Sequence, residues 1–223
     1  MTDIKVVRGA DEFDALCCFR YRIHVEELGR RSVESGDADR RIAGPLDRSA
    51  INVVALKAGE IVGCARVNFA SDGNLGNYEQ FYGMHRAGDD HPARTSTVTC
   101  LLLAPHVRGG ALCRRMLIEC YRIGVRSGIR WNYIDCIAPL VPLFERHGFV
   151  QHLPPAAHPA YGFTVHRARL DLDDEQHLAA VGSPFLAMHR ELLPERGSDD
   201  GMAAGRVPEP DPGGFAGQLS CSH

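Results

Sequence analysis

The stretch Thr97-Val-Thr-Cys-Leu-Leu-Leu-Ala-Pro-His-Val-Arg-Gly-Gly-Ala-Leu-Cys-Arg-Arg-Met-Leu117 carries the most information about the fold. Its apolar first half predicts a strand, and its second half predicts a helix that ends near Gly128. Between them lies a turn with Arg108, Gly109 and Gly110. Free N–H groups at the start of a helix carry partial positive charge, and the glycines leave room for the backbone to approach an anion. The turn is therefore suited to a pyrophosphate or a phosphopantetheine phosphate.

A glycine-rich corner between a strand and a helix would produce the same local pattern, so the downstream sequence matters. A second predicted strand runs from Trp131 to Ile137, and Phe144-Glu-Arg-His-Gly-Phe149 follows it. This order of strand, Arg-Gly turn, helix, strand and helix ending in Gly-Phe resembles the acyl-donor half of the GNAT N-acyltransferase superfamily. Two positions depart from the usual turn motif, since Ala111 and Cys113 stand where that motif has small residues, most often glycine.

The resemblance implies an α/β (α+β) fold with a mixed central sheet, splayed parallel strands and helices on both faces. It also implies that a pantetheine arm enters between the splayed strands. The residues expected to bind this donor are Leu102, Leu103, Ala104, Val107, Arg108, Gly109, Gly110, Ala111, Leu112 and Arg114.

Composition narrows the class of protein. A formal net charge of −3 over 223 residues argues against a general nucleic-acid binder. The eight cysteines include no Cys-x-x-Cys pair, so they are expected to pack in the core, and no metal site is predicted. The start of the chain lacks a secretory pattern and no apolar run approaches the ~18 residues of a membrane span. A reducing cytoplasm is the expected compartment.

Periodicity and turn residues predict one domain over residues 1–194 and a disordered Gly- and Pro-rich tail over 195–223. A loop over 30–48 could cover a site, and 85–96 is expected to be a polar loop. Strands are expected near 4–7, 51–56, 61–69, 97–104, 131–137, 148–153 and 161–171, and helices near 11–28, 77–84, 108–127, 140–147 and 173–193.

The first half of the chain carries a narrower resemblance. The ordered segments are Phe19-Arg-Tyr-Arg-Ile-His-Val-Glu-Glu-Leu-Gly29, Pro45-Leu-Asp47, Asn52-Val-Val-Ala-Leu56 and Gly63-Cys-Ala-Arg-Val67. They look like the autoinducer (acyl-homoserine-lactone) synthases and the related N-acyl amino acid synthases, with matches at Arg20, Asp47 and Arg66. Those synthases have an aromatic residue at the position of His24 and an acidic residue at that of Gly44. Their fourth strand reads Glu-x-Ser/Thr-Arg, of which only Thr99 is kept here, so lactone formation is not expected.

Acyl transfer to an amine needs a neutral amine, a donor for the oxyanion and a proton for the leaving thiolate. The catalytic candidates are Asp47, Arg66, His24 and Glu26, and the N–H of Leu103 could serve the oxyanion. An arginine can hold a carboxylate through two parallel hydrogen bonds, which would suit an amino acid acceptor. Asp47 and Arg66 could instead form a structural ion pair.

Three further residues complete the predicted acceptor side: Arg20, Thr99 and Phe144. Many GNAT enzymes have a tyrosine where Phe144 stands and use it to protonate the thiolate. A phenyl ring has no proton to give, so another group or solvent would do this.

The predicted function is an N-acyltransferase that moves an acyl group from acyl-CoA or an acyl carrier protein to the amine of a small molecule, with an amino acid as one candidate. A basic stripe on the helix after the turn could bind the phosphates of CoA, dock an acidic carrier protein, or simply face solvent. It consists of Arg108, Arg114, Arg115, Arg122 and Arg126. The alternatives are an acetyl-CoA-dependent acetyltransferase and a non-catalytic protein that binds an acyl thioester or a carrier protein. The oligomeric state is left open.

Overall fold

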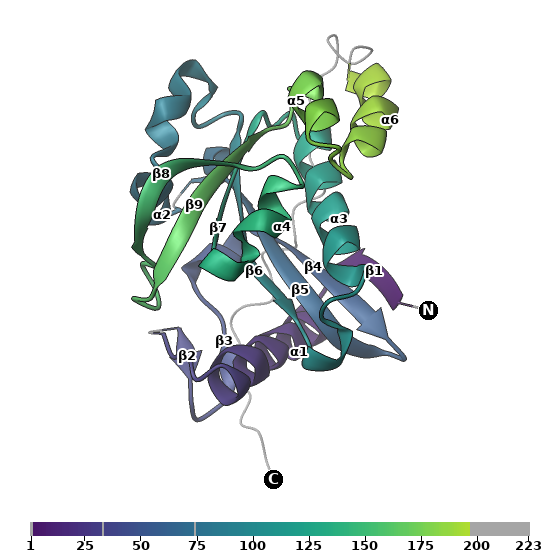
Figure 1. The fold of residues 1–223 in the computed structure, drawn as a ribbon. Coiled ribbons are helices and arrows are strands. Elements are labelled where there is room, and N and C mark those ends of the chain that lie inside the picture. Colours follow the sequence, from purple (N-terminus) through teal and green to yellow (C-terminus); the bar gives the residue numbers. More distant parts are fainter. Residues whose placement is uncertain (1, 33, 74, 197–223) are drawn as a thin grey trace.

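The computed structural model describes residues 2–32, 34–73 and 75–196. At its centre is a seven-stranded sheet in the order β1-β4-β5-β6-β7-β9-β8, in which only β6 and β7 run parallel (Figure 1). The strands are β1 (Thr2–Val6), β4 (Ile51–Lys57), β5 (Glu60–Phe69), β6 (Thr95–Leu103), β7 (Trp131–Cys136), β8 (Val150–Ala157) and β9 (Thr164–Asp171). A separate hairpin pairs β2 (Ser35–Gly36) with β3 (Arg41–Ile42).

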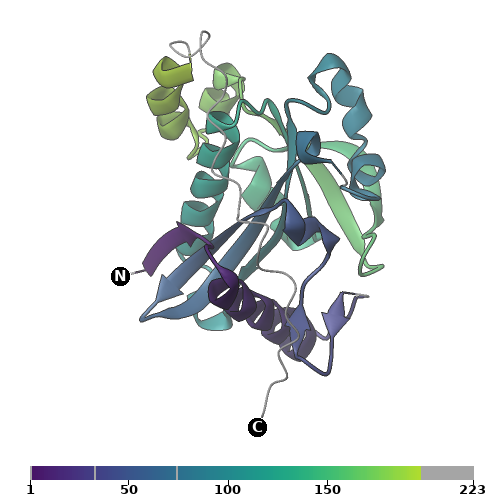
Figure 2. The same cartoon turned by 180° about the vertical axis from the view of Figure 1, so that it is seen from behind.

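Helices cover both faces of the sheet, as Figures 1 and 2 show from opposite sides. One face, called the α1 face below, carries α1 (Ala10–Tyr21), its π-helical continuation (Arg22–Glu27) and α2 (Tyr78–Tyr82). The other, called the α3 face, carries α3 (Leu112–Arg126), α4 (Val141–Glu145), α5 (Glu175–Ala180) and α6 (Leu186–Arg196). Short 3-10 turns lie at Pro45–Arg48, Ala70–Asp72, Met84–Asp90, Pro105–Val107 and Ala138–Leu140.

The α3 face holds the main apolar core. On α3, Leu112, Met116, Cys120 and Val125 recur at helical spacing and are buried against the sheet. Gly124 lets the helix approach closely, because a Cβ there would lie 2.9 Å from a methyl carbon of Leu172. The α1 face differs because it buries charged side chains, among them Arg20 and Arg66, beside smaller apolar clusters.

The predicted mixed sheet with helices on both faces is confirmed, and most element boundaries fall within a few residues of the prediction. The expected helix over 173–193 is wrong as a single element, because α5 ends at Ala180 and a turn with Gly182 at φ 62° separates it from α6. The predicted polar loop over 85–96 contains a 3-10 segment and the first residues of β6. Most of the tail predicted over 195–223 lies outside the described residues.

Seven cysteines of the described segments, from Cys17 to Cys136, are free thiols. Within the same segments, no helix has both the length and the apolar character needed to cross a membrane.

Candidate functional site

Strands β6 and β7 pair over only three residues each, Thr95–Thr97 against Trp131–Tyr133. Both strands continue past this point without pairing to each other in the described residues. A β-bulge in β6 accompanies the separation, and Cys100 there has a φ of 51°. Since a bulge bends its strand, β6 turns away from β7. This confirms the predicted splay of the two parallel strands.

The open edge of β6 presents the backbone of Leu103 to the gap. Ala104 donates its N–H to the carbonyl of Val62 on β5 at 2.9 Å. Peptide groups alternate in direction along a strand, so the N–H and C=O of Leu103 face away from β5 and toward β7. The Leu103 carbonyl accepts a hydrogen bond from Nε of Arg108 at 2.9 Å, whereas its N–H is available to a ligand.

The turn after β6 leads into an uncapped helix start. Gly109 has a φ of 73°, a conformation that favours glycine, and no side chain caps the first turn of α3. The free N–H groups there adjoin an open hollow of about 550 Å³. Two arginines, Arg114 and Arg146, give its rim a basic character. The lining residues are Gly109, Gly110, Ala111, Arg114, Leu143, Arg146, His147, Val181, Gly182 and Pro184.

On the α1 face, two arginines share one carboxylate below the surface. Asp47 accepts from Nη1 of Arg20 at 2.8 Å, from Nη1 of Arg66 at 3.4 Å and from the N–H of Gly44 at 2.9 Å. The exposed fractions of the three side chains are 0% for Arg20, 4% for Asp47 and 3% for Arg66. Burial alone would raise the pKa of Asp47, but the two arginines outweigh it and hold that pKa below its usual value.

The remaining bonds of this cluster leave two guanidinium nitrogens without a partner among the described residues, and one of them, Nε of Arg20, is fully buried. Arg20 also donates to the side chain of Asn52 at 2.6 Å, and Nε of Arg66 donates to the hydroxyl of Thr99 at 3.0 Å. Nη2 of Arg66 makes no hydrogen bond with any of the described residues. Two buried arginines therefore share the Asp47 carboxylate, with Glu34 as a second negative charge that acts on Arg66, and Nη2 of Arg66 can bind an anion.

Glu34 supplies a carboxylate where the resemblance implies one at position 44. A Cβ on Gly44 would lie 2.3–2.6 Å from the carboxylate atoms of Glu34, so a side chain at position 44 would displace that carboxylate. Glu34 is half-buried, and its charge adds to those that raise the pKa of Arg66. The loop before β4 thus replaces a lost acidic side chain with one from a different position in the sequence.

His24 lies in the π-helical turn that continues α1. It is 5% exposed, and its ring stacks on Tyr161 with centroids 4.9 Å apart. Neither ring nitrogen has a hydrogen-bond partner among the described residues. Burial, assisted by Arg30 and Arg20, lowers the pKa of His24 to about 4. The ring is therefore neutral at physiological pH and is a weak base.

Three residues near the gap on the α1 face were not singled out from the sequence. The hydroxyl of Tyr82 donates to Oδ1 of Asp135 at 2.5 Å, and Nε2 of His158 lies 3.8 Å from Oδ2 of the same carboxylate. A sequence signal existed for Asp135 alone, since it is a charged residue in an otherwise apolar central strand. Its partners come from 53 residues before it and 23 after it, and no pattern links them.

The structure thus brings Arg20, Asp47, Arg66 and Thr99 together, but other predicted residues lie apart from them. Glu26 forms an ion pair with Arg40 at the surface. Phe144 packs in the core of the α3 face against Phe149, with ring centroids 5.7 Å apart.

Arg108 does not reach into the hollow beside α3. Its guanidinium forms an ion pair with Glu27 at the end of the π-helical turn. The basic groups of the hollow are instead Arg114 and Arg146, and His147 lines it as a buried ring whose pKa burial lowers; Arg146 and His147 were missed from the sequence.

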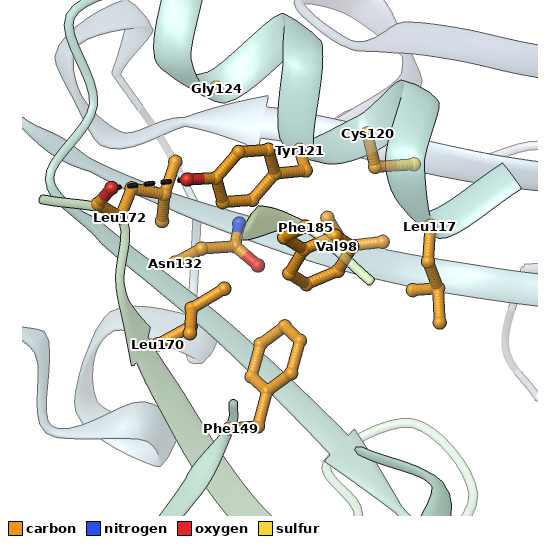
Figure 3. Close-up of a pocket in the computed structure, with 10 residues that line it drawn as sticks. All are labelled: Val98, Leu117, Cys120, Tyr121, Gly124, Asn132, Phe149, Leu170, Leu172 and Phe185. Carbon is orange, nitrogen blue, oxygen red and sulfur yellow. Dashed lines mark hydrogen bonds between the residues drawn. The ribbon is translucent and has the colours of Figure 1, made fainter. Parts of the chain in front are cut away.

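The core of the α3 face is closed next to the point where β6 and β7 separate. The space there has a volume of about 10 Å³, which is about the least that one water molecule needs (Figure 3). Phe185 fills it and stacks on Tyr121 with centroids 4.5 Å apart. The lining residues are Val98, Leu117, Cys120, Tyr121, Gly124, Asn132, Phe149, Leu170, Leu172 and Phe185.

Comparison with known proteins gives matches in structure. No family model matches the chain, and no curated protein matches its sequence. TofI, solved in a ternary complex with an inhibitor and MTA, is 25% identical with a TM-score of 0.59. The match covers 83% of this chain and 98% of the TofI chain.

Two further matches have lower identity. BjaI, a CoA-dependent acyl-homoserine lactone synthase solved with MTA, is 16% identical with a TM-score of 0.62, over 86% of this chain and 100% of its own. FeeM, an N-acyl amino acid synthase from uncultured soil microbes, is 13% identical with a TM-score of 0.63. This match covers 84% of this chain and 98% of FeeM. The chain therefore has the GNAT-like fold of these synthases, as the resemblance in its sequence predicted.

Proposed function

We propose that this chain is an N-acyltransferase that moves an acyl group from acyl-CoA to the amine of a small acceptor that carries a carboxylate, such as an amino acid. The observation that carries the proposal is the buried cluster of Arg20, Asp47 and Arg66 beside the gap between β6 and β7. Asp47 bonds to both arginines, whereas Nη2 of Arg66 has no partner among the described residues, so an acceptor carboxylate would bind there. The synthases that share the fold acylate amines, which supports the reaction class.

CoA is the proposed donor because of the hollow beside the start of α3. A nucleotide diphosphate needs a concave, basic site, and this hollow combines free helix N–H groups with Arg114 and Arg146. From there the pantetheine arm would run along the open edge of β6 to Leu103. The N–H of Leu103 would then hydrogen-bond the oxygen that becomes negative as the amine attacks.

The test is a mass-spectrometric search for acylated amines. The purified chain is incubated with acetyl-, butanoyl- and octanoyl-CoA, and separately with acyl carrier protein, in a pool of amino acids that includes S-adenosylmethionine. The expected result is one new N-acyl amino acid with CoA as the donor. Product with carrier protein alone would contradict the choice of donor, and no product with any donor would contradict the reaction.

The matched variants are Arg66→Met and Arg22→Met. The first removes the open guanidinium and is expected to raise KM for the acceptor at least 10-fold while CoA binding stays unchanged. Arg22 is an arginine on the π-helical turn that contributes nothing to the cluster, so its loss should leave both constants as they are. An unchanged acceptor KM in Arg66→Met would contradict the assigned carboxylate site.

A further inference from the structure

We infer that Asp135 is the base that removes a proton from the acceptor amine, and that Tyr82 and His158 position its carboxylate. The inference rests on the proposed function, because it names the base for that same acyl transfer.

Asp135 stands where the reacting groups would meet. It follows Tyr133, the last residue of β7 that pairs with β6, by two positions, and so lies along the open part of the gap. Side chains alternate along a strand, which places Asp135 on the α1 face together with Tyr133 and Arg66. Its side chain is 13% exposed, so a small ligand in the gap can reach it.

One neighbour hydrogen-bonds the carboxylate, and a second lies close to it. The hydroxyl of Tyr82 donates to Oδ1 at 2.5 Å, and burial together with Asp135 holds the pKa of Tyr82 well above its usual value, so it remains a donor. Nδ1 of His158 accepts the N–H of Ala160 at 3.1 Å. In the neutral ring the proton then sits on Nε2, which lies 3.8 Å from Oδ2. The carboxylate keeps lone pairs on both oxygens for a third group.

The surroundings favour proton uptake. Burial raises the pKa of Asp135 above its usual value, and His158 and Tyr82 offset this only in part. The titratable groups that interact with it on this face are Tyr78 and Tyr82 on α2 and His158 after β8, and Arg167 on β9 is its partner across the strand pair. The Arg167 guanidinium is held by the carbonyls of Phe81 and Pro154.

The other acidic or basic candidates are less suitable. Both oxygens of Asp47 are engaged by arginines, and these hold its pKa low. His24 has a pKa of about 4, and Glu26 is paired at the surface with Arg40. Strand β6 has Val98 between Thr97 and Thr99, and none of its residues carries a carboxylate.

In the proposed step, the acceptor ammonium transfers one proton to Asp135. The freed lone pair attacks the thioester carbonyl, so that a C–N bond forms and the carbonyl oxygen becomes negative. Collapse breaks the C–S bond, and the leaving thiolate takes a second proton from the same nitrogen. The products are the amide and free CoA, and Asp135 returns its proton to solvent.

The test compares Asp135→Asn with Asp171→Asn in the full chain, using the donor and amine that the wild type prefers. Asp171 on β9 pairs with Arg130 away from the gap. Asp135→Asn is expected to lower kcat/KM at pH 7 by about 10²–10⁴-fold, the usual loss of a general base, with an unchanged Kd for CoA. Asp171→Asn should stay within about 3-fold of the wild type, a margin well below that loss.

Tyr82→Phe tests the positioning role through pH. Removing a donor to the charged carboxylate raises its pKa, so the acid limb of the kcat/KM profile should move to higher pH. The ¹³C signal of Asp135, assigned by its loss in Asp135→Asn, should titrate above the usual range and move further in Tyr82→Phe. A merely structural tyrosine would move neither.

The outcomes separate the two proposals. If the wild type acylates an amine but Asp135→Asn retains its rate within about 3-fold, or Asp135 titrates at or below its usual pKa, this inference is overturned and the function stands. If the wild type acylates nothing, both fall.

Discussion

Asp47→Asn is the most informative single substitution, because it removes the one negative charge that two buried arginines share. At an effective dielectric constant of about 20, a charge at 2.8 Å contributes about 6 kcal/mol and one at 3.4 Å about 5 kcal/mol. The cost of burying the carboxylate and the repulsion between the arginines offset part of this attraction. Breaking such a buried pair typically lowers the free energy of unfolding by about 3–5 kcal/mol, which is the loss we expect at pH 7.

Urea denaturation followed by circular dichroism measures this loss, and Asp14→Asn is the control. Asp14 pairs with Arg41 at the surface, where its side chain is 53% exposed. An exposed pair contributes less than about 1 kcal/mol, so this control should unfold close to the wild-type midpoint.

The pH dependence gives a second check. The pKa of folded Asp47 lies below its usual value of 3.8, so its stabilisation is present above that value and is lost as the pH falls through the folded pKa. The difference between wild type and Asp47→Asn should therefore shrink in acid. A loss below about 1 kcal/mol at pH 7, or a difference that does not change with pH, would refute the assigned charge compensation.

Three further predictions address other parts of the molecule. Phe185→Ala should lower the free energy of unfolding by about 3–5 kcal/mol in urea, since it empties the closed core of Figure 3, and a loss under 1 kcal/mol would contradict that packing. Arg146→Ala should weaken CoA binding about 10-fold as measured by calorimetry, and the loss should be larger at low salt. Arg115→Ala should leave CoA binding unchanged, because Arg115 donates a hydrogen bond to the carbonyl of Thr2 outside the hollow. His24 has a folded pKa of about 4 against 6.5 unfolded, so it costs stability as the pH falls from 6.5 toward 4. His24→Phe should flatten that part of the pH–stability curve, and an unchanged slope would count against the buried neutral ring.

The sequence predicted the architecture well because its signals are local. The apolar run before Arg108, the two glycines and the helix that follows are contiguous, and so they define a strand, a turn and a helix without knowledge of the rest. The three residues matched in the sequence, Arg20, Asp47 and Arg66, lie in contact with one another in the structure. Their catalytic and binding roles remain predictions.

What could not be predicted depends on contacts between distant segments. Glu34 fills the space that Gly44 leaves only because the loop before β4 folds back on itself. Tyr82, Asp135 and His158 meet only once α2 and the turn after β8 close over the same part of the sheet. Arginine is a common phosphate ligand and Arg108 lies in the predicted phosphate turn. In the structure, however, it forms an ion pair with Glu27 of the π-helical turn.

The separation of β6 and β7 also predicts the kinetic order in which the two substrates bind. The hollow beside α3 and the arginine cluster lie on opposite faces of one sheet, on either side of the gap between these strands. For the proposed reaction, each substrate thus has its own entrance, and neither must leave before the other enters. Initial-rate lines at varied concentrations of both substrates should intersect, and each product should inhibit competitively only against the substrate that shares its entrance.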